Sequence, residues 1–235
     1  MSAPGSGLAE EIDLAVTPLR ELNAALHSAA DDGPRHWRVL NPRGAHALAA
    51  GIDAPIEVDI EGHAGYYCAG MNKHATVRVH GNSGVGLAEN IMSGRVVVDG
   101  SASQSAGATG HGGLVVIRGD ASARCGISMK GVDIVVHGSV GHMSAFMAQK
   151  GRLVVCGDAG EALGDSIYEA RLYVRGDVAA LGADCVQKEM RDEHVAELGE
   201  LLDAAQVEGA EPSQFRRYGS ARRLYNFDVD NAGEY

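Results

Sequence analysis

Glycine returns at a fixed interval of nineteen residues through the middle of the chain. The seven marker glycines are Gly62, Gly81, Gly100, Gly119, Gly138, Gly157 and Gly176. A unit that recurs at a short, fixed period is typical of a solenoid, in which each unit contacts mainly its neighbours. This repeat therefore constrains the fold more than any other feature of the sequence.

Two positions before each marker glycine are aliphatic in every repeat. Four residues before the glycine stand Val58, Val77, Val96, Val115, Ile134, Leu153 and Leu172. Two residues before it stand Ile60, Val79, Val98, Ile117, Val136, Val155 and Val174. Apolar residues two apart indicate a short strand with one face in a core. Because nineteen residues are too few for a strand, a crossover helix and a return strand, each repeat is predicted to form one coil of a parallel β-helix.

We therefore predict an all-β core, a right-handed parallel β-helix of about seven coils over residues 55–186. All six prolines lie outside residues 56–211, which suits strands that need every backbone N–H. The alternative is the left-handed β-helix of hexapeptide-repeat acyltransferases and carbonic anhydrases. Its coils hold eighteen residues with an aliphatic side chain every six, a pattern that this sequence does not follow.

The segments on either side of the repeat are predicted to be different from it. Residues 1–54 are expected to form an N-terminal helical and capping extension, with a helix over residues 18–31. Residues 187–235 are expected to form a C-terminal helix, over residues 187–206, and a docking tail. Since the end coils of a solenoid must be covered, both helices are expected to act as caps.

The position three residues before each marker glycine is expected to face outward. It holds Asp59 and Arg78 in the first two repeats, and then Val97, Val116, Val135, Val154 and Tyr173. Parallel strands that are apolar on both faces are normally covered on both. Either a terminal segment of the chain or a partner protein is therefore expected to lie on these five residues, which makes them a candidate interface.

The tail combines arginine with aromatic residues in an otherwise acidic chain of net charge −11. The candidate interface residues in it are Phe215, Arg216, Arg217, Tyr218, Arg222, Arg223, Tyr225 and Phe227. Arginine and aromatic side chains contribute most of the binding energy at many protein interfaces. We expect the tail to dock on another subunit, and the alternative is that it folds back on its own chain.

No catalytic, cofactor-binding or metal-binding residue is predicted. Cys68 and Cys125 hold the same repeat position three coils apart, about 14 Å along the stack, too far for a disulfide. The histidines are interpreted as structural or surface residues. The acidic net charge argues against nucleic acid, and no apolar run is long enough for a membrane span. Without a basic start followed by an apolar stretch, no secretion signal is expected, so we predict a cytoplasmic protein.

Several segments resemble a known family. AENIMSGRVVVDG (88–100), SAGATGHGGLVVIRG (105–119) and CGISMKGVDIVVHG (125–138) are similar to the glycine-patterned (GXGXG) β-helix domain of glutamate synthases, which is related to a subunit of formylmethanofuran dehydrogenases. DLAVTPLRELNAALH (13–27) and FRRYGSARRLYNF (215–227) resemble the free-standing version of that domain, the β-helical subunit of N-methylglutamate synthase.

This resemblance implies a structural, non-catalytic subunit of a hetero-oligomeric enzyme. Its partners would be an amidotransferase-like subunit and a glutamate synthase-like subunit that holds FMN and an iron–sulfur cluster. The implied reaction converts methylamine and glutamate into N-methylglutamate and ammonia. The alternatives are the equivalent scaffold of a glutamine-dependent glutamate synthase or of a formylmethanofuran dehydrogenase-like complex.

Overall fold

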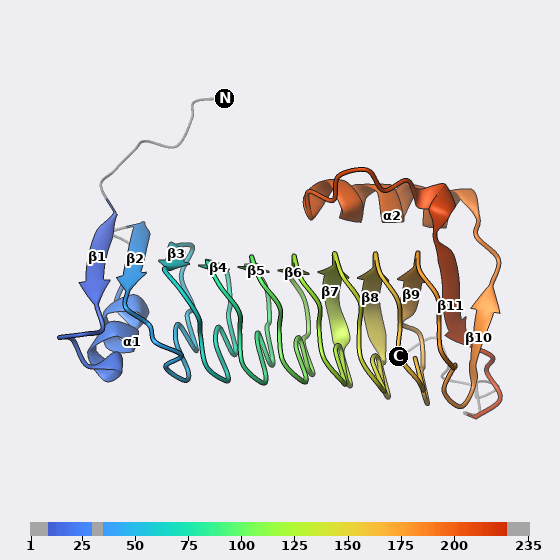
Figure 1. Ribbon diagram of the computed structural model, residues 1–235, viewed down its shortest axis with the longest axis horizontal. Coiled ribbons are helices and arrows are strands. Elements are labelled where there is room, and N and C mark those ends of the chain that lie inside the picture. The colour runs from blue at the N-terminus through green and yellow to red at the C-terminus, as the bar shows by residue number, and fades with distance from the viewer. Residues whose placement is uncertain (1–8, 30–34, 225–235) are drawn as a thin grey trace, which may run out of the picture.

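The molecule is an elongated stack of coils with a helix at one end and another along one side (Figure 1). The computed structural model describes residues 9–29 and 35–224. Within these residues, eleven strands form one sheet in the order β1-β2-β3-β4-β5-β6-β7-β8-β9-β11-β10. Strands β3 to β9 follow one another along the long axis, one for each marker glycine. The predicted parallel β-helix of about seven coils is confirmed.

The seven strands of the repeat pair in parallel. They are β3 (Glu57–Ile60), β4 (Thr76–Val79), β5 (Arg95–Val98), β6 (Leu114–Ile117), β7 (Lys130–Val136), β8 (Lys150–Val155) and β9 (Arg171–Val174). Their register follows the nineteen-residue period, so that Val58 pairs with Val77 and Val77 with Val96. One irregularity occurs where β7 and β8 start, because Lys130 pairs with Lys150 whereas Asp133 pairs with Arg152.

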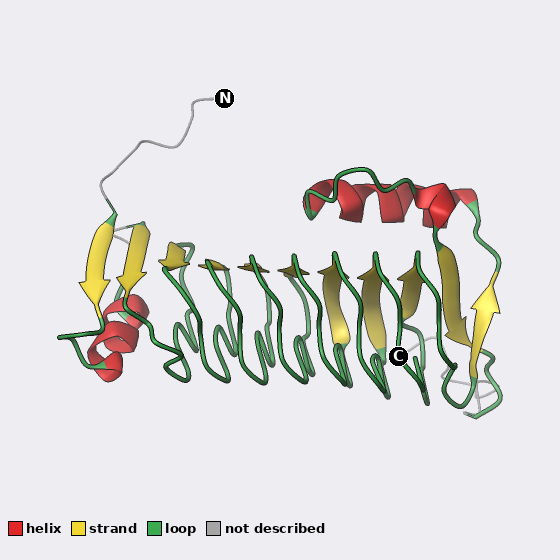
Figure 2. Cartoon of the chain, viewed as in Figure 1, coloured by secondary structure: helices red, strands yellow, loops and turns green. Residues whose placement is uncertain are grey.

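Both aliphatic rows point into the coil and are fully buried, as Val96 and Val98 illustrate at 0% exposure. Most of each coil is loop rather than strand (Figure 2). These loops are also ordered by stacking, because a second row of parallel bridges joins successive coils, for example from Ala64 to Ser83 and from Ser83 to Ala102. Each coil therefore supports the next on more than one side.

The marker glycines are required by the close approach of neighbouring coils. A Cβ atom added at Gly100 would lie 2.8 Å from the carbonyl oxygen of Gly81, and one at Gly157 would lie 2.7 Å from the carbonyl carbon of Gly138. Only Gly62 among the seven has a positive φ. Glycine is therefore needed here for space between backbones rather than for an unusual φ.

The residue after each marker glycine forms a ladder of side-chain acceptors. The backbone N–H of Ser101 donates to Oδ1 of Asn82 at 2.8 Å, and that of Asp120 donates to Oγ of Ser101 at 3.1 Å. The ladder continues through Ser139 and Asp158. The side chains at this position therefore link one coil to the next.

The N-terminal segment lengthens the sheet. β1 (Glu10–Asp13) pairs in parallel with β2 (His36–Leu40), and β2 pairs in parallel with β3. Both strands lie within the range that was expected to form the extension. Between them, α1 (Leu19–His27) lies at the end of the stack and buries Leu22 and Leu26 in the solenoid core (Figure 1).

The C-terminal segment comprises β10 (Cys185–Lys188), α2 (Asp192–Ala204), the 3-10 turn η1 (Pro212–Gln214) and β11 (Arg216–Ser220). β11 and β10 continue the sheet beyond β9 in antiparallel pairing. The expectation that the C-terminal helix caps the last coil is wrong, because α2 lies lengthwise along the outer face of the sheet (Figure 1). No helix in the described part of the chain is both long enough and apolar enough to cross a membrane.

Candidate functional site

The outward apolar row is covered by the chain's own C-terminal helix. Its five members, Val97, Val116, Val135, Val154 and Tyr173, are at most 6% exposed. They form a second core with Leu198, Leu201 and Leu202 of α2, separate from the core inside the coils. Of the two expected occupants, the chain's own terminal segment is the correct one. These five residues were a candidate interface, and the surface that they contact is α2 of the same chain.

The aromatic and arginine tail also folds back on its own chain over residues 215–220. β11 pairs Arg217 with Tyr173 of β9 and with Lys188 of β10. Phe215 and Tyr218 are buried, and Nε of Arg217 donates to the Glu189 carbonyl oxygen at 2.9 Å.

The guanidinium of Arg216 donates to the carbonyl oxygen of Gly176. The docking prediction is therefore wrong for Phe215, Arg216, Arg217 and Tyr218. Without β11, the edge of β9 would leave backbone N–H and C=O groups unpaired, and pairing with β11 supplies their hydrogen bonds. Arg222 and Arg223 are exposed beyond β11, and Tyr225 and Phe227 lie outside the described residues.

The outer face of β2–β4 is charged instead of apolar, and its ion pairs reach Asp99, which follows β5. A chain of ion pairs crosses it from His36 to Asp59 (2.6 Å), from Asp59 to His80 (3.0 Å), and from His80 to Asp99 (2.8 Å). A carboxylate oxygen of Asp99 also lies 3.5 Å from Nε of Arg118. We call this region the open face, because the side chains of His80 and Asp99 remain 37% and 46% exposed.

The ion pairs of the open face shift the pKa values of their members. Burial alone would raise the pKa of Asp59, but hydrogen bonds from His36 and His80 outweigh it, so the pKa is lowered. Burial alone would lower the pKa of His80, but the carboxylates of Asp99 and Asp59 outweigh it and raise the pKa. The charged forms of both residues are therefore favoured.

α2 ends where the outer face changes from apolar to charged. The carbonyl oxygen of Ala204 accepts a hydrogen bond from Nη2 of Arg95 at 2.6 Å, and Oε1 of Gln206 accepts one from Nη2 of Arg118 at 3.1 Å. Cations are favourable at the C-terminal end of a helix because the backbone dipoles leave partial negative charge there. These contacts fix how far α2 extends along the sheet.

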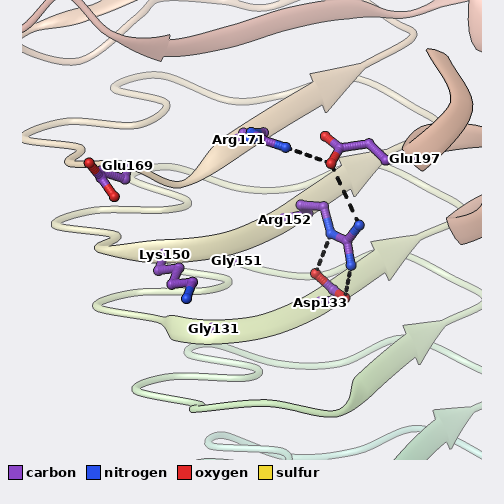
Figure 3. Close-up of a pocket in the computed structure, with 8 residues that line it drawn as sticks. All are labelled: Gly131, Asp133, Lys150, Gly151, Arg152, Glu169, Arg171 and Glu197. Carbon is purple, nitrogen blue, oxygen red and sulfur yellow. Dashed lines mark hydrogen bonds and ion pairs between the residues drawn. The ribbon is translucent and has the colours of Figure 1, made fainter. Parts of the chain in front are cut away.

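A charged pocket of about 330 Å³ lies beside α2, over the starts of β7, β8 and β9 (Figure 3). Nε and Nη2 of Arg152 donate to the two carboxylate oxygens of Asp133 at 2.7 and 2.5 Å. Glu197 of α2 accepts a hydrogen bond from Nη1 of Arg171 at 2.6 Å and another from the hydroxyl of Tyr173. Burial, together with the Glu197 carboxylate, raises the pKa of Tyr173, which therefore stays a donor.

This network fixes the N-terminal half of α2 to the sheet and contains no activated nucleophile. Sequence reasoning missed it, although a signal was present. The signal is the repeat position five residues before the marker glycine, which holds Asp133, Arg152 and Arg171. Because this position recurs in each coil, the three charges lie side by side on adjacent strands.

The cysteines are buried, free thiols. Burial raises the pKa of Cys68 and of Cys125 to about 12, and that of Cys156 to about 11. Because the thiolate is the reactive form, these side chains are inert as nucleophiles at neutral pH. In the ranges that the structure describes, no three histidine, cysteine or carboxylate side chains come together as a set of metal ligands.

These features define a class of protein: a parallel β-solenoid of nineteen-residue coils whose outer face is half open and half covered by its own C-terminal helix. No protein-family model matches the chain. Over 225 residues it is 63% identical to Protein GlxC of Rhizobium meliloti (strain 1021), a match that covers 95% of this chain and 99% of that protein. The chain therefore belongs to the GlxC family.

Proposed function

We propose that the chain is a structural, non-catalytic subunit of an N-methylglutamate synthase-type complex. In this proposal it positions an amidotransferase-like subunit and a glutamate synthase-like subunit in the cytoplasm, and the complex converts methylamine and glutamate into N-methylglutamate and ammonia. The assignment to the GXGXG β-helix family, and to its free-standing version, rests on the sequence resemblance of the repeat and of both flanking segments.

The observation that carries the scaffold role is the uniform stacking of the coils. Apart from the irregularity where β7 and β8 start, each strand of the repeat pairs in register with the next. Acceptor side chains join the coils again after the first six marker glycines. A stack of coils that is hydrogen-bonded on several sides resists bending. A subunit that sets the distance between other chains needs this rigidity.

The cofactors are assigned to a partner subunit. An iron–sulfur cluster is held by cysteine thiolates, usually four together. The four cysteines of this chain are buried and free, and their thiols favour the protonated form. These residues do not fit a cluster, so we propose that the cluster and the FMN belong to the glutamate synthase-like partner.

Purification of the tagged chain from its native host tests the proposal. We expect an amidotransferase-like chain and a flavin-bearing chain to co-purify with it, and methylamine-dependent turnover to require all of them. Turnover by the isolated chain would contradict a scaffold role. Partners that carry molybdopterin or tungsten would favour the formylmethanofuran dehydrogenase-like complex, and strict dependence on glutamine would favour a glutamate synthase.

A further inference from the structure

The pocket in Figure 3 adjoins other pockets over the same sheet, and we call the row of them the groove. In one direction the groove continues past the residues that precede β5 and β6, and this segment shares Asp133 and Arg152 with the pocket. In the other direction it continues over β10 and β11, and that segment shares Glu169 and Arg171 with the pocket. A further segment, lined by Lys130 and Gln149, shares Lys150 and Glu169 with the pocket. Together these adjoining pockets extend over more strands than a compact small molecule would contact.

The groove is basic although the chain is acidic. Eight of the chain's 20 lysines and arginines line it, but only five of its 31 aspartates and glutamates do. Three of the four lysines in the whole sequence are among them, namely Lys130, Lys150 and Lys188. Positive charge is therefore concentrated along this groove.

These three lysines have no acidic partner. Among the described residues, no carboxylate lies within ion-pair distance of their ammonium groups, whereas the fourth lysine, Lys73, lies 3.0 Å from Asp53. Lys130 and Lys150 occupy paired positions on neighbouring strands, so their Cα atoms lie about 5 Å apart. A ligand that carries several separated negative charges would compensate them.

The cations at the other end of the groove are crowded together. Lys188 pairs with Arg217 across β10 and β11. Burial, together with the charges of Arg171 and Arg191, lowers the pKa of Arg217. Burial and then Arg217 lower the pKa of His194, which lines the same segment. Five lysines and arginines but only two glutamates line this segment, although the net charge of the chain is −11.

We propose that this groove binds an extended, acidic segment of a partner protein. The length of the groove fits a polypeptide, and its unpaired lysines fit separated carboxylates. The carboxylates that alternate with the cations, such as Glu169 and Glu193, would repel the closely spaced phosphates of a nucleic acid. This inference rests on the proposed scaffold role, because it identifies one surface through which a partner is held.

Binding of a labelled oligoglutamate peptide to the isolated full-length chain tests the inference, with fluorescence anisotropy as the readout. We expect binding at about 0.01 M ionic strength, where the Debye length is about 30 Å, and loss of binding at about 1 M, where it is about 3 Å. The double variant Lys150→Gln, Lys188→Gln should bind about tenfold more weakly. The matched control Lys73→Gln, which removes a lysine outside the groove, should bind as tightly as wild type.

Other outcomes overturn the inference. Equal binding by the double variant, equal binding of an oligoglutamine peptide, or no binding by either the wild type or the tail variant below would show that the groove does not select an acidic segment. Displacement of the peptide by equimolar inorganic phosphate would indicate a small-anion site. The variant Asp228→Asn, Asp230→Asn, Glu234→Gln tests the chain's own C-terminal segment, and peptide binding by this variant alone would make that segment the occupant. Co-purification of partners is measured separately, so the scaffold role can hold where the groove assignment fails.

Discussion

The open face and the covered face belong to one sheet and have the same interior. Val77 in β4 and Ile134 in β7 hold the same repeat position, and both are fully buried inside the coil. The two regions differ outside it, where Arg78 of β4 faces outward in the position that Val135 occupies in β7. One outward position per coil therefore decides whether the sheet stays open or holds a helix.

The consequence is visible in the path of the chain after the last coil. α2 turns back over β7–β9, and its C-terminal end lies against Arg95 and Arg118 (Figure 1). Apolar burial stabilises its position on the covered face, at roughly 25 cal/mol for each Å² removed from water. If α2 lay on the open face instead, the charged side chains there would lose their contact with water and with their present ion-pair partners. This cost disfavours α2 in that position.

Placing a charge in the covered face should have the largest effect. Val135→Asp puts a carboxylate at a fully buried position between the sheet and α2. We expect a loss of about 3–5 kcal/mol in the free energy of unfolding, because the charge has no partner and no water there. Urea denaturation followed by circular dichroism measures the loss.

Arg78→Gln is the matched control, because it changes the same repeat position in the open face. It removes one ion pair, with Glu57 at 2.9 Å, and should cost less than about 1 kcal/mol. Similar losses for Val135→Asp and Arg78→Gln would contradict the division of the sheet into two faces.

The repeat explains why the coils were predictable and the cover was not. A period of nineteen residues fixes the strands, the inner rows and the approach of the glycines, because each depends on local spacing. The position of α2 depends instead on a contact between segments far apart in the sequence. The apolar row from Val97 to Tyr173 predicted that a protein segment covers it. The sequence did not indicate whether that segment belongs to this chain or to a partner, and the structure shows that it is α2.

Two other features were hidden for local reasons. In the coil after Gly81, a left-handed φ occurs at Gly86, Ala88 and Asn90, and five other coils repeat the pattern. Only the middle position is always glycine or alanine, so the other two left no compositional signal. In β2, Trp37 takes an inner position of the sheet, but Asn41 stands where a marker glycine would end the strand, so the coil was not recognised.

Alanine at a marker glycine should have an intermediate effect that is equal in the two regions. The added Cβ would meet backbone atoms at 2.8 Å in Gly81→Ala, under the open face, and at 2.7 Å in Gly157→Ala, under the covered face. We expect each variant to lose about 1–3 kcal/mol in thermal or urea unfolding, since both force neighbouring coils apart. Losses that differ by more than the measurement error would show that α2 or the ion pairs alter the spacing of the coils.

The pH dependence of the open face should give the smallest effect, and its sign is fixed by His80. The pKa of this residue is raised above 6.5, because its hydrogen bonds to Asp99 and Asp59 outweigh the opposing effect of burial. Protonated His80 therefore stabilises the fold fully below pH 6.5, and the contribution is lost as the pH rises through the pKa of the folded state. The pKa of Asp59 is lowered, so its own contribution is lost only in acid, as the pH falls through its folded-state pKa.

The variant His80→Gln isolates this contribution. Wild type should exceed it in stability by less than about 1 kcal/mol, because the ion pairs are exposed to water and salt. The difference should be greatest in mildly acidic solution, between the two titrations, and should vanish at alkaline pH in urea midpoints measured across the range. A difference that instead grew with pH would mean that neutral His80 is the stabilising form. Neutral His80 would then act as a hydrogen-bond partner of the Asp59 and Asp99 carboxylates, and the open face would not depend on a cation at this position.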